Sequence, residues 1–207
     1  MDSFIVKISS MQILHLSDTH NRHHQLSNLP AADVLIHSGD FSCDGTVKEV
    51  LDFIEWFGAL PYKYKIFVAG NHDDCLFEAQ IDGLPDGCFY LSNSSIEIEN
   101  IKFHGIPMFM ADLVSGECSK HFSEIPSDTN VLITHQPPFG LHDFSEGINY
   151  GDLDLLRAVL KIRPAYHLFG HIHDSYGISK NKHTKFSNAS LVDMHYQLVN
   201  QPFGFEY

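Results

Sequence analysis

The fold of this chain is decided by one stretch of sequence, His167-Leu168-Phe169-Gly170-His171-Ile172-His173. Its apolar first half is typical of a buried strand, and Gly170 marks the end of that strand. In extended backbone, residues i and i+2 point to the same side, so the imidazoles of His171 and His173 lie on one side of the chain. An isolated pair of this kind is weak evidence, and its meaning depends on the other strand ends.

The same arrangement, a short apolar run followed by polar residues, occurs four more times. The runs, each with the pattern of a buried strand, are Ile13–Leu16, Val34–His37, Ile66–Val68 and Val131–Thr134. The polar residues that follow them are Ser17-Asp18-Thr19-His20, Gly39-Asp40, Gly70-Asn71-His72-Asp73 and His135. Because ligands bind beyond the carboxyl ends of strands in α/β sheets, we expect these side chains to converge.

Two segments have the apolar spacing of helices. Thr46–Leu60 begins with Thr46 and Glu49, the two residues of a capping box. Leu153–Ile162 is preceded by Asp152 and is followed by Pro164, which ends a helix.

The remaining apolar runs predict strands. Phe89–Leu91, Ile96–Ile98 and Ile101–His104 are separated by polar turns and favour an antiparallel meander, and the tail from Thr184 to Phe205 is strand-rich. Parallel β-α units followed by hairpins predict an α/β fold. The expected architecture is a four-layer α-β-β-α sandwich of two packed mixed sheets with flanking helices.

Length and composition indicate one domain, residues 11–207, behind an N-terminal extension over residues 1–10. The four cysteines form no C-x-x-C pair, and we find neither a secretion signal nor a membrane span. We therefore expect a cytoplasmic protein with reduced thiols and no membrane partner. The net charge of −13 argues against an extended nucleic-acid track, whereas 15 histidines against 13 Lys and Arg suggest metal binding.

Each polar fragment alone has an ordinary structural explanation, such as a solvated turn or an Asx-turn before a helix. Together, in order and each at a strand end, they offer two carboxylates, one amide oxygen and four imidazoles. The residues are Asp18, Asp40, Asn71, His20, His135, His171 and His173. Nitrogen and oxygen donors without thiolate suit Mn, Fe, Zn, Co or Ni better than Ca.

The five fragments, D-x-H, G-D, G-N-H-D, H and G-H-x-H, resemble the calcineurin-like metallophosphoesterase superfamily. Within it the chain is similar to the brain metallophosphoesterase-domain proteins, a branch related to class III cyclic-nucleotide phosphodiesterases. That closer likeness is carried by Leu35–Asp40, Asp128–Pro138, His167–His173 and Asn188-Ala189-Ser190.

The resemblance implies a role for each site residue. Asp18, His20 and His173 would hold a first metal ion, and Asn71, His135 and His171 a second, with Asp40 as the bridge. His72, beside Asn71, would contact the substrate and act as the general acid. Two departures from the pattern also matter. The segment Pro107–Pro126 is short for a lid, and no Arg follows Asp40, which argues against a protein phosphatase.

The resulting hypothesis is hydrolysis of phosphoric esters, foremost small phosphodiesters such as cyclic nucleotides. Two divalent ions, Mn²⁺ first among the candidates, would activate a shared water as hydroxide. The alternatives are a phosphomonoesterase, a nuclease, which would need a basic groove, and last a non-catalytic scaffold, which would lack metal ligands. The sequence leaves the oligomeric state open.

The other histidines divide into three groups. We expect packing or supporting roles for His15, His37, His104 and His167, which lie in or beside apolar runs. His142 and Arg22 are possible substrate contacts. No role is assigned to His23, His24, His121, His183 and His195.

Overall fold

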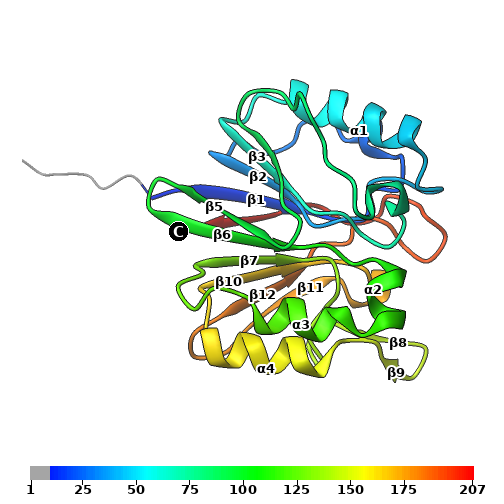
Figure 1. Ribbon diagram of the computed structural model, residues 1–207. Helices are drawn as coiled ribbons and strands as arrows, with labels where there is room; N and C mark the ends of the chain where they lie inside the picture. The colour runs from blue at the N-terminus through cyan, green and yellow to red at the C-terminus, as the bar shows by residue number, and fades with distance from the viewer. Residues whose placement is uncertain (1–9) are drawn as a thin grey trace, which may run out of the picture.

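The computed structural model describes residues 10–207, so the extension expected over residues 1–10 lies outside the described residues except for Ser10. Two large sheets pack face to face, with α1 (Val47–Ala59) outside one and α3 (Glu117–Ser123) and α4 (Leu153–Ile162) outside the other (Figure 1). The expected four-layer α-β-β-α sandwich is therefore confirmed. Among the described residues, no helix is long and apolar enough to cross a membrane.

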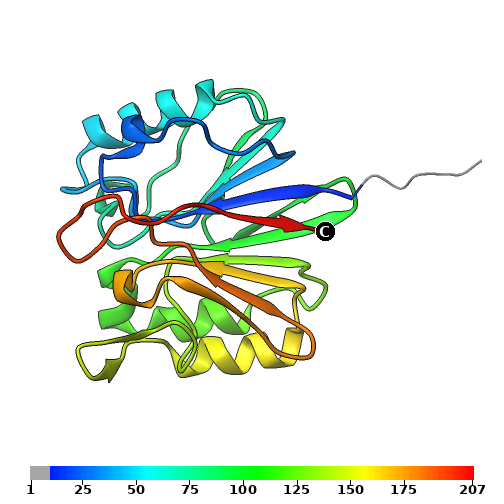
Figure 2. The same cartoon turned by 180° about the vertical axis from the view of Figure 1, so that it is seen from behind.

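The first sheet has five strands, in which β1, β2, β3 and β4 run parallel and β13 pairs antiparallel to β1. In spatial order they are β13 (Phe203–Glu206), β1 (Gln12–Leu16), β2 (Val34–His37), β3 (Tyr64–Phe67) and β4 (Cys88–Tyr90). Figure 2 shows the last strand lying beside the first, so this sheet is completed by the C-terminal segment.

The second sheet has six strands, in the order β11 (Gly177–Lys180), β12 (Lys185–Asn188), β10 (Tyr166–Phe169), β7 (Val131–Thr134), β6 (Ile101–Ile106) and β5 (Ser94–Ile98). Its outer face carries α3 (Glu117–Ser123) and α4 (Leu153–Ile162), which pack against each other. A two-stranded hairpin, β8 (Phe144–Ser145) and β9 (Ile148–Asn149), projects near the strand ends (Figure 1).

Strands buried on both faces explain the continuous apolar runs. In β2, Val34 and Ile36 pack between the two sheets, whereas Leu35 packs under α1. In β7, Val131 joins the core between the sheets and Leu132 packs under the helices of the other side. Because side chains alternate along a strand, each sheet contributes to two separate cores.

Both predicted helices are present with their predicted caps. α1 spans Val47–Ala59, and a full capping box joins Thr46 and Glu49 before it. The Asp152 side chain accepts a hydrogen bond from the Leu155 amide at the start of α4. These caps satisfy backbone donors that have no partner within the helix.

The meander prediction was wrong in one respect. β5 and β6 form the expected antiparallel hairpin in the second sheet, but β4 pairs parallel to β3 in the first sheet. The segment Pro107–Pro126, which we described only as short for a lid, contains α2 (Met110–Ser115) and α3. Residues Cys118 and Phe122 of α3 are buried, which explains why that helix packs against the sheet.

Candidate metal centre

The carboxyl ends of β1, β2, β7 and β10 lie along one edge of the sandwich, where the two sheets meet. Ser17, after β1, forms a parallel bridge with Ser190, after β12. This bridge joins the ends of the two sheets, so the polar residues that follow the strands converge there.

Three overlapping clusters of potential metal ligands occupy this edge. One contains Asp18, His20 and His173, a second contains Asp40, His135 and His171, and a third contains His20, Asp40 and His72; within each cluster the ligand atoms lie within 4.8 Å of one another. The family resemblance implies one ion for Asp18, His20 and His173 and another for His135 and His171, and the structure brings the side chains of each set together.

Asp40 lies close to histidines of the first and second clusters, and Asn71 lies close to the second cluster. Asp40 Oδ2 lies 3.2 Å from His135 Nε2 and 3.7 Å from His20 Nε2, so this carboxylate stands between the clusters. Asn71 Oδ1 lies 3.2 Å from His135 Nε2. All seven predicted ligands are therefore brought together.

The orientation of three imidazoles favours metal binding over hydrogen bonding. The Nδ1 atoms of His20, His135 and His173 lie 3.1, 2.8 and 3.1 Å from the backbone carbonyl oxygens of Ser42, Ser38 and Asp193. A carbonyl only accepts, so each Nδ1 carries a proton, and an Nε2 atom that is not also protonated turns its lone pair towards the cluster.

These lone pairs face other acceptors. His20 Nε2 and His173 Nε2 are 3.2 Å apart, and His135 Nε2 faces the Asp40 carboxylate. Converging lone pairs and carboxylates repel one another unless a cation or a proton lies between them. The donor set thus fits divalent ions, which neutral imidazoles and carboxylates bind.

Both carboxylates are held by neighbouring groups. The Asp18 carboxylate accepts hydrogen bonds from the Ser190 hydroxyl at 2.9 Å and from the His171 amide at 3.1 Å. Asp40 Oδ1 accepts from the His72 amide at 2.8 Å. Asp18, Asp40 and His171 also have φ angles of 52°, 56° and 73°, in the sparsely populated left-handed region. Strained backbone of this kind clusters at functional sites.

Asp73 ties the loops after β2 and β3 together. Its buried carboxylate accepts from the amides of Asp40, Ser42 and Gly70 and from the Ser42 hydroxyl, at 2.7–2.9 Å. Burial and the nearby Asp40 charge raise the pKa of Asp73 to about 7 in the metal-free protein. The last residue of the Gly70–Asp73 motif therefore positions the bridging candidate without lining the site.

Burial and mutual charge set the pKa values of the cluster. Burial lowers the pKa of His20 and of His171 to about 4, which keeps both rings neutral. Burial opposes ionisation of Asp40, but the neighbouring His135 outweighs it and lowers the pKa of Asp40 to about 2. Burial alone would lower the pKa of His135, but the Asp40 carboxylate outweighs it and raises this pKa to about 9. In the absence of metal, a proton therefore lies between His135 and Asp40.

Two glycines leave room for the carboxylates. A Cβ on Gly70 would meet Asp40 Oδ1, and a Cβ on Gly170 would meet Asp18 Oδ2 and Ser17 Oγ. Both contacts would be closer than real Cβ atoms tolerate. The motifs therefore require glycine at these positions for space.

A hollow of about 250 Å³ opens onto the clusters, and we call it the central hollow. Its floor contains Asp40, Asn71, His72, His171 and His173, and its rim includes Ser145, Glu146, Tyr150, Met194 and Tyr196. His142 and Arg22, which the sequence marked as possible substrate contacts, are not among its lining residues. The helices α2 and α3 do not line it either.

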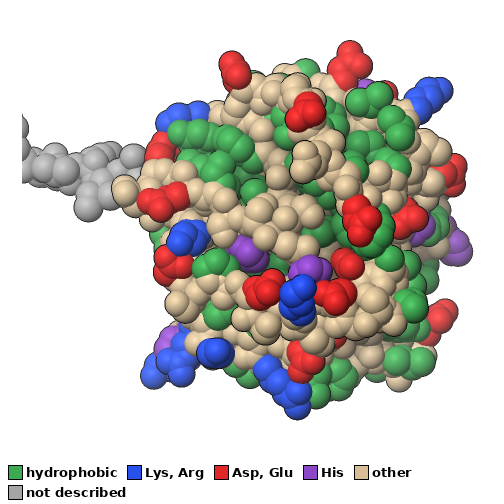
Figure 3. All heavy atoms as spheres, viewed as in Figure 1, with side chains coloured by type: hydrophobic (Ala, Val, Ile, Leu, Met, Phe, Trp, Pro, Cys, Tyr) green, Lys and Arg blue, Asp and Glu red, His purple; other side chains and the backbone are tan. Residues whose placement is uncertain are grey.

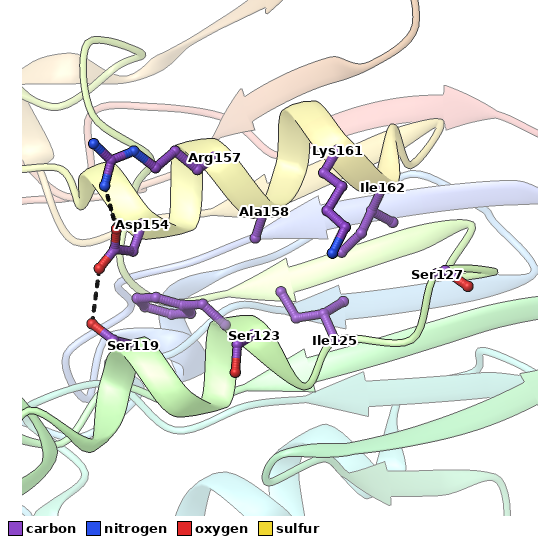
Figure 4. Close-up of a pocket in the computed structure, with 10 residues that line it drawn as sticks. Ser119, Ser123, Ile125, Ser127, Asp154, Arg157, Ala158, Lys161 and Ile162 are labelled. Atoms are coloured by element: carbon purple, nitrogen blue, oxygen red, sulfur yellow. Dashed lines mark hydrogen bonds and ion pairs between the residues drawn. The ribbon is translucent and has the colours of Figure 1, made fainter.

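A wider hollow of about 410 Å³ lies elsewhere, between α3 and α4 (Figure 4). Its one carboxylate, Asp154, is already paired with Arg157 and Ser119. None of the clusters of potential metal ligands lies among its lining residues. The larger of the two hollows therefore lacks metal ligands, and we place the functional site at the smaller, central hollow.

The expected supporting histidines are buried. His15 bonds with Ser38 and Ser187, and His167 bonds with Thr134. Likewise, the His37 ring contacts the Thr19 hydroxyl and the His104 ring contacts the Ser95 hydroxyl.

Sequence analysis missed three residues with clear positions at the site. Ser190 was noted only as part of a similar stretch, although its hydroxyl holds Asp18. Asp73 was quoted without a role. Tyr196 gave no signal, yet its ring centroid lies 4.7 Å from that of His20 and 6.3 Å from that of His72. Its φ of 57° places it in a strained turn, which a sequence pattern does not reveal.

Comparison with known proteins agrees with this geometry. The model of the family described as calcineurin-like phosphoesterase matches residues 11–175. The chain belongs to this family. The resemblance seen in the motifs is thereby confirmed, and the chain is a phosphoesterase-family protein whose Asp and His clusters fit divalent metal ions.

Individual relatives give the same result. A human protein named metallophosphoesterase domain-containing protein 1 is 34% identical over 90% of this chain and 68% of its own length. A UPF0046 protein of Caenorhabditis elegans is 35% identical over 96% of this chain and 81% of its own. One solved structure at 12% identity covers 96% of this chain and 100% of its own with a TM-score of 0.62, which shows a shared fold.

Proposed function

We propose that this calcineurin-like phosphoesterase hydrolyses small phosphodiesters, such as cyclic nucleotides, with two divalent metal ions. The observation that carries the proposal is the set of Nε2 lone pairs and carboxylates converging at the strand ends. Asp18, His20 and His173 would hold one ion, Asn71, His135 and His171 the other, and Asp40 would bridge them.

Ions bound there would supply Lewis-acid chemistry, neutralising phosphoryl charge and easing deprotonation of water. Mn²⁺ is the first candidate because the donors are oxygen and nitrogen without thiolate. The chain's own contribution is placement. Asp18 is fixed by Ser190, and Asp40 by the His72 amide, so each carboxylate has one preferred orientation before a substrate arrives.

His72 is the proposed general acid. Its Nδ1 lies 2.7 Å from the Cys43 carbonyl oxygen, and the residue lines the central hollow. With Nδ1–H bound to that carbonyl, Nε2 is the ring nitrogen left to carry a transferable proton. From there it can donate a proton to the leaving oxygen of the ester, a contribution of about 10²–10⁴-fold for a general acid.

The charge of the hollow supports a diester. No Lys or Arg is among the described residues that line it, and Glu146 stands on its rim. A phosphomonoester carries a second negative charge, which such a lining does not neutralise, whereas a diester carries only one. This favours the diester over the monoester.

The surface supports a small substrate over a nucleic acid. On the face drawn in Figure 3, most Lys and Arg side chains stand among Asp and Glu, and the few that gather at the lower left edge form no continuous stripe. The chain has a net charge of −13, and polyanion binding needs clustered positive charge.

The test is a comparison of two chromogenic esters. The protein is stripped of metal, restored with Mn²⁺, and assayed on bis-p-nitrophenyl phosphate and p-nitrophenyl phosphate, with Asp40→Ala as the control. Metal-dependent cleavage of the diester, abolished in Asp40→Ala, is the expected result. Faster cleavage of the monoester would make the protein a phosphomonoesterase. Absence of metal binding would favour a scaffold.

A further inference from the structure

A second group of potential metal ligands lies outside the central hollow. His23 and His24, in the short 3₁₀ helix η1 (His23–Gln25), face Asp52 on α1. Their Nε2 atoms each lie 3.0 Å from the same oxygen, Asp52 Oδ2. None of these residues belongs to the five motifs.

The surroundings of His23 are unusual for a ring that only forms a hydrogen bond. The residue is fully buried, packed against Trp56 and Phe53 at ring-centroid distances of 5.0 and 5.8 Å. Its Nδ1 has no hydrogen-bond partner among the described residues. Packing alone would favour an apolar residue here, because a buried polar atom without a partner costs free energy. The other ring nitrogen, Nε2, is the only polar atom of the ring with a partner, and that partner is Asp52.

The other two members are open to solvent. The side chains of His24 and Asp52 are 56% and 52% exposed, so an ion can enter from outside. Burial lowers the pKa of His23, against the effect of Asp52, and a neutral ring is the form that binds metal. Two imidazoles and one carboxylate form a three-ligand set that leaves a position for water and suits Zn²⁺, Ni²⁺ or Cu²⁺.

We propose that His23, His24 and Asp52 form a peripheral binding site for one borderline divalent transition-metal ion. The ion replaces the shared hydrogen-bond contacts and links η1 to α1. Because η1 begins three residues after His20, this link would brace the loop that carries Asp18 and His20. The site is independent of the identity of the ions in the central hollow and of the reaction catalysed there.

The only tryptophan of the chain provides a local reporter. Ni²⁺ quenches indole fluorescence at short range, and Trp56 touches the His23 ring. Full-length protein is titrated with Ni²⁺ while Trp56 fluorescence is recorded, and bound ions per chain are counted after equilibrium dialysis. The variants are His24→Ala, Asp52→Asn and, as a matched control, His183→Ala, an exposed histidine outside every ligand cluster.

The expected result is a loss of one bound ion per chain, with at least about tenfold weaker quenching affinity, in His24→Ala and Asp52→Asn. His183→Ala should behave as the unmodified protein. Asp40→Ala, which alters only the central hollow, should retain the quenching. Equal ion counts and equal quenching in His24→Ala and the unmodified protein would overturn the proposal and leave a hydrogen-bonded pair. His24 is exposed, so its removal leaves no cavity, and circular dichroism confirms that the variant folds.

Discussion

The Nε2 atoms of His20 and His173 face each other at 3.2 Å, although the two residues are 153 positions apart in the chain. Backbone carbonyls hold the opposite nitrogen of each ring, so neither ring can turn its lone pair away without losing a hydrogen bond. The protein thus maintains an arrangement that needs a proton or a cation between the two nitrogens. Its stability should therefore rise when metal is added.

Ser190→Ala should weaken metal binding while leaving the fold intact. The Ser190 hydroxyl donates to Asp18 Oδ2 at 2.9 Å, and without this hydrogen bond the carboxylate is held less firmly in the orientation that faces the metal cluster. Removal of such a supporting bond typically costs about 10–100-fold in metal affinity. Isothermal titration with Mn²⁺ measures the loss, and Ser119→Ala, a surface serine bonded to Asp154, serves as the control. Unchanged affinity in Ser190→Ala would show that the hydrogen bond is not needed for metal binding.

His72→Ala should retain both metal ions and lose about 10²–10⁴-fold in rate. The loss should be smaller for a p-nitrophenyl ester than for an alkyl ester, because an acidic phenol departs without a proton. Single-turnover rates on the two esters test this, with metal content measured in parallel. A variant that loses metal, or that slows both esters equally, would contradict the general-acid role.

Gly170→Ala should unfold at lower temperature and bind metal poorly. The added methyl would collide with Asp18 Oδ2 and Ser17 Oγ, which are buried and cannot move aside. Destabilisation of about 1–3 kcal/mol is typical of an overpacked site. Gly204→Ala is the matched control, since nothing lies within 4 Å of its Cβ. Thermal melts with and without Mn²⁺ separate the two effects, and similar melting temperatures for the two variants would refute the steric argument.

Tyr196→Ala should raise KM for an aromatic diester by about tenfold with little change in kcat. The ring stands on the rim of the central hollow, where it can stack on a flat leaving group; such stacking contributes about 1–3 kcal/mol per ring in related recognition. Tyr207→Ala is the control, because Tyr207 has the same 38% exposure and lies outside the hollow. A fall in kcat alone would assign Tyr196 to the chemical step instead.

The metal-free protein should lose stability in mild acid. Burial lowers the pKa of His15 and His167 to about 3 and of His104 to about 4. Below pH ~6.5 the unfolded chain binds a proton at each ring and the folded chain does not. Each ring therefore removes about 1.4 kcal/mol per pH unit as pH falls from 6.5 towards the folded pKa.

Urea unfolding of the Asp40→Ala protein at pH 7.5, 6.5 and 5.5 measures this slope without interference from metal release. His104→Gln should reduce the change in unfolding free energy per pH unit by the contribution of one imidazole. The hydrogen-bond partner of His104, Ser95, does not titrate and adds nothing to it. Stability that is level between pH 6.5 and 5.5 would contradict the argument.

Local signals were sufficient for most elements. The capping box of Thr46 and Glu49 and the cap of Asp152 predicted both longer helices correctly, because caps act within one turn. The sheet assignment of β4 was missed because its three residues are placed by pairing with β3. α2 is only six residues long, so its apolar residues Met110, Leu113 and Val114, although at helical spacing, form too short a pattern to assign. For α3, the spacing of the apolar residues Cys118 and Phe122 at i and i+4 could have been detected in the sequence, and both side chains are buried.

At the site, residue types were predictable and geometry was not. The motifs named every donor that the structure brings together, since metal-type residues after strands are a local pattern. The contacts that orient these donors come from distant segments. Asp193 supplies the carbonyl for His173, and the local turn that begins at Asp193 carries Tyr196 to the rim. No motif in the sequence links that turn to the site.

The bond between Ser190 and Asp18 joins positions 172 residues apart, and this has a consequence for biosynthesis. During translation Asp18 emerges well before Ser190 and stays without this support until Ser190 has left the ribosome. Contacts of such high sequence separation form late and slow the folding of a domain. Metal insertion is therefore expected as a final, post-translational step, and a chain interrupted before residue 190 would fail to retain its ions.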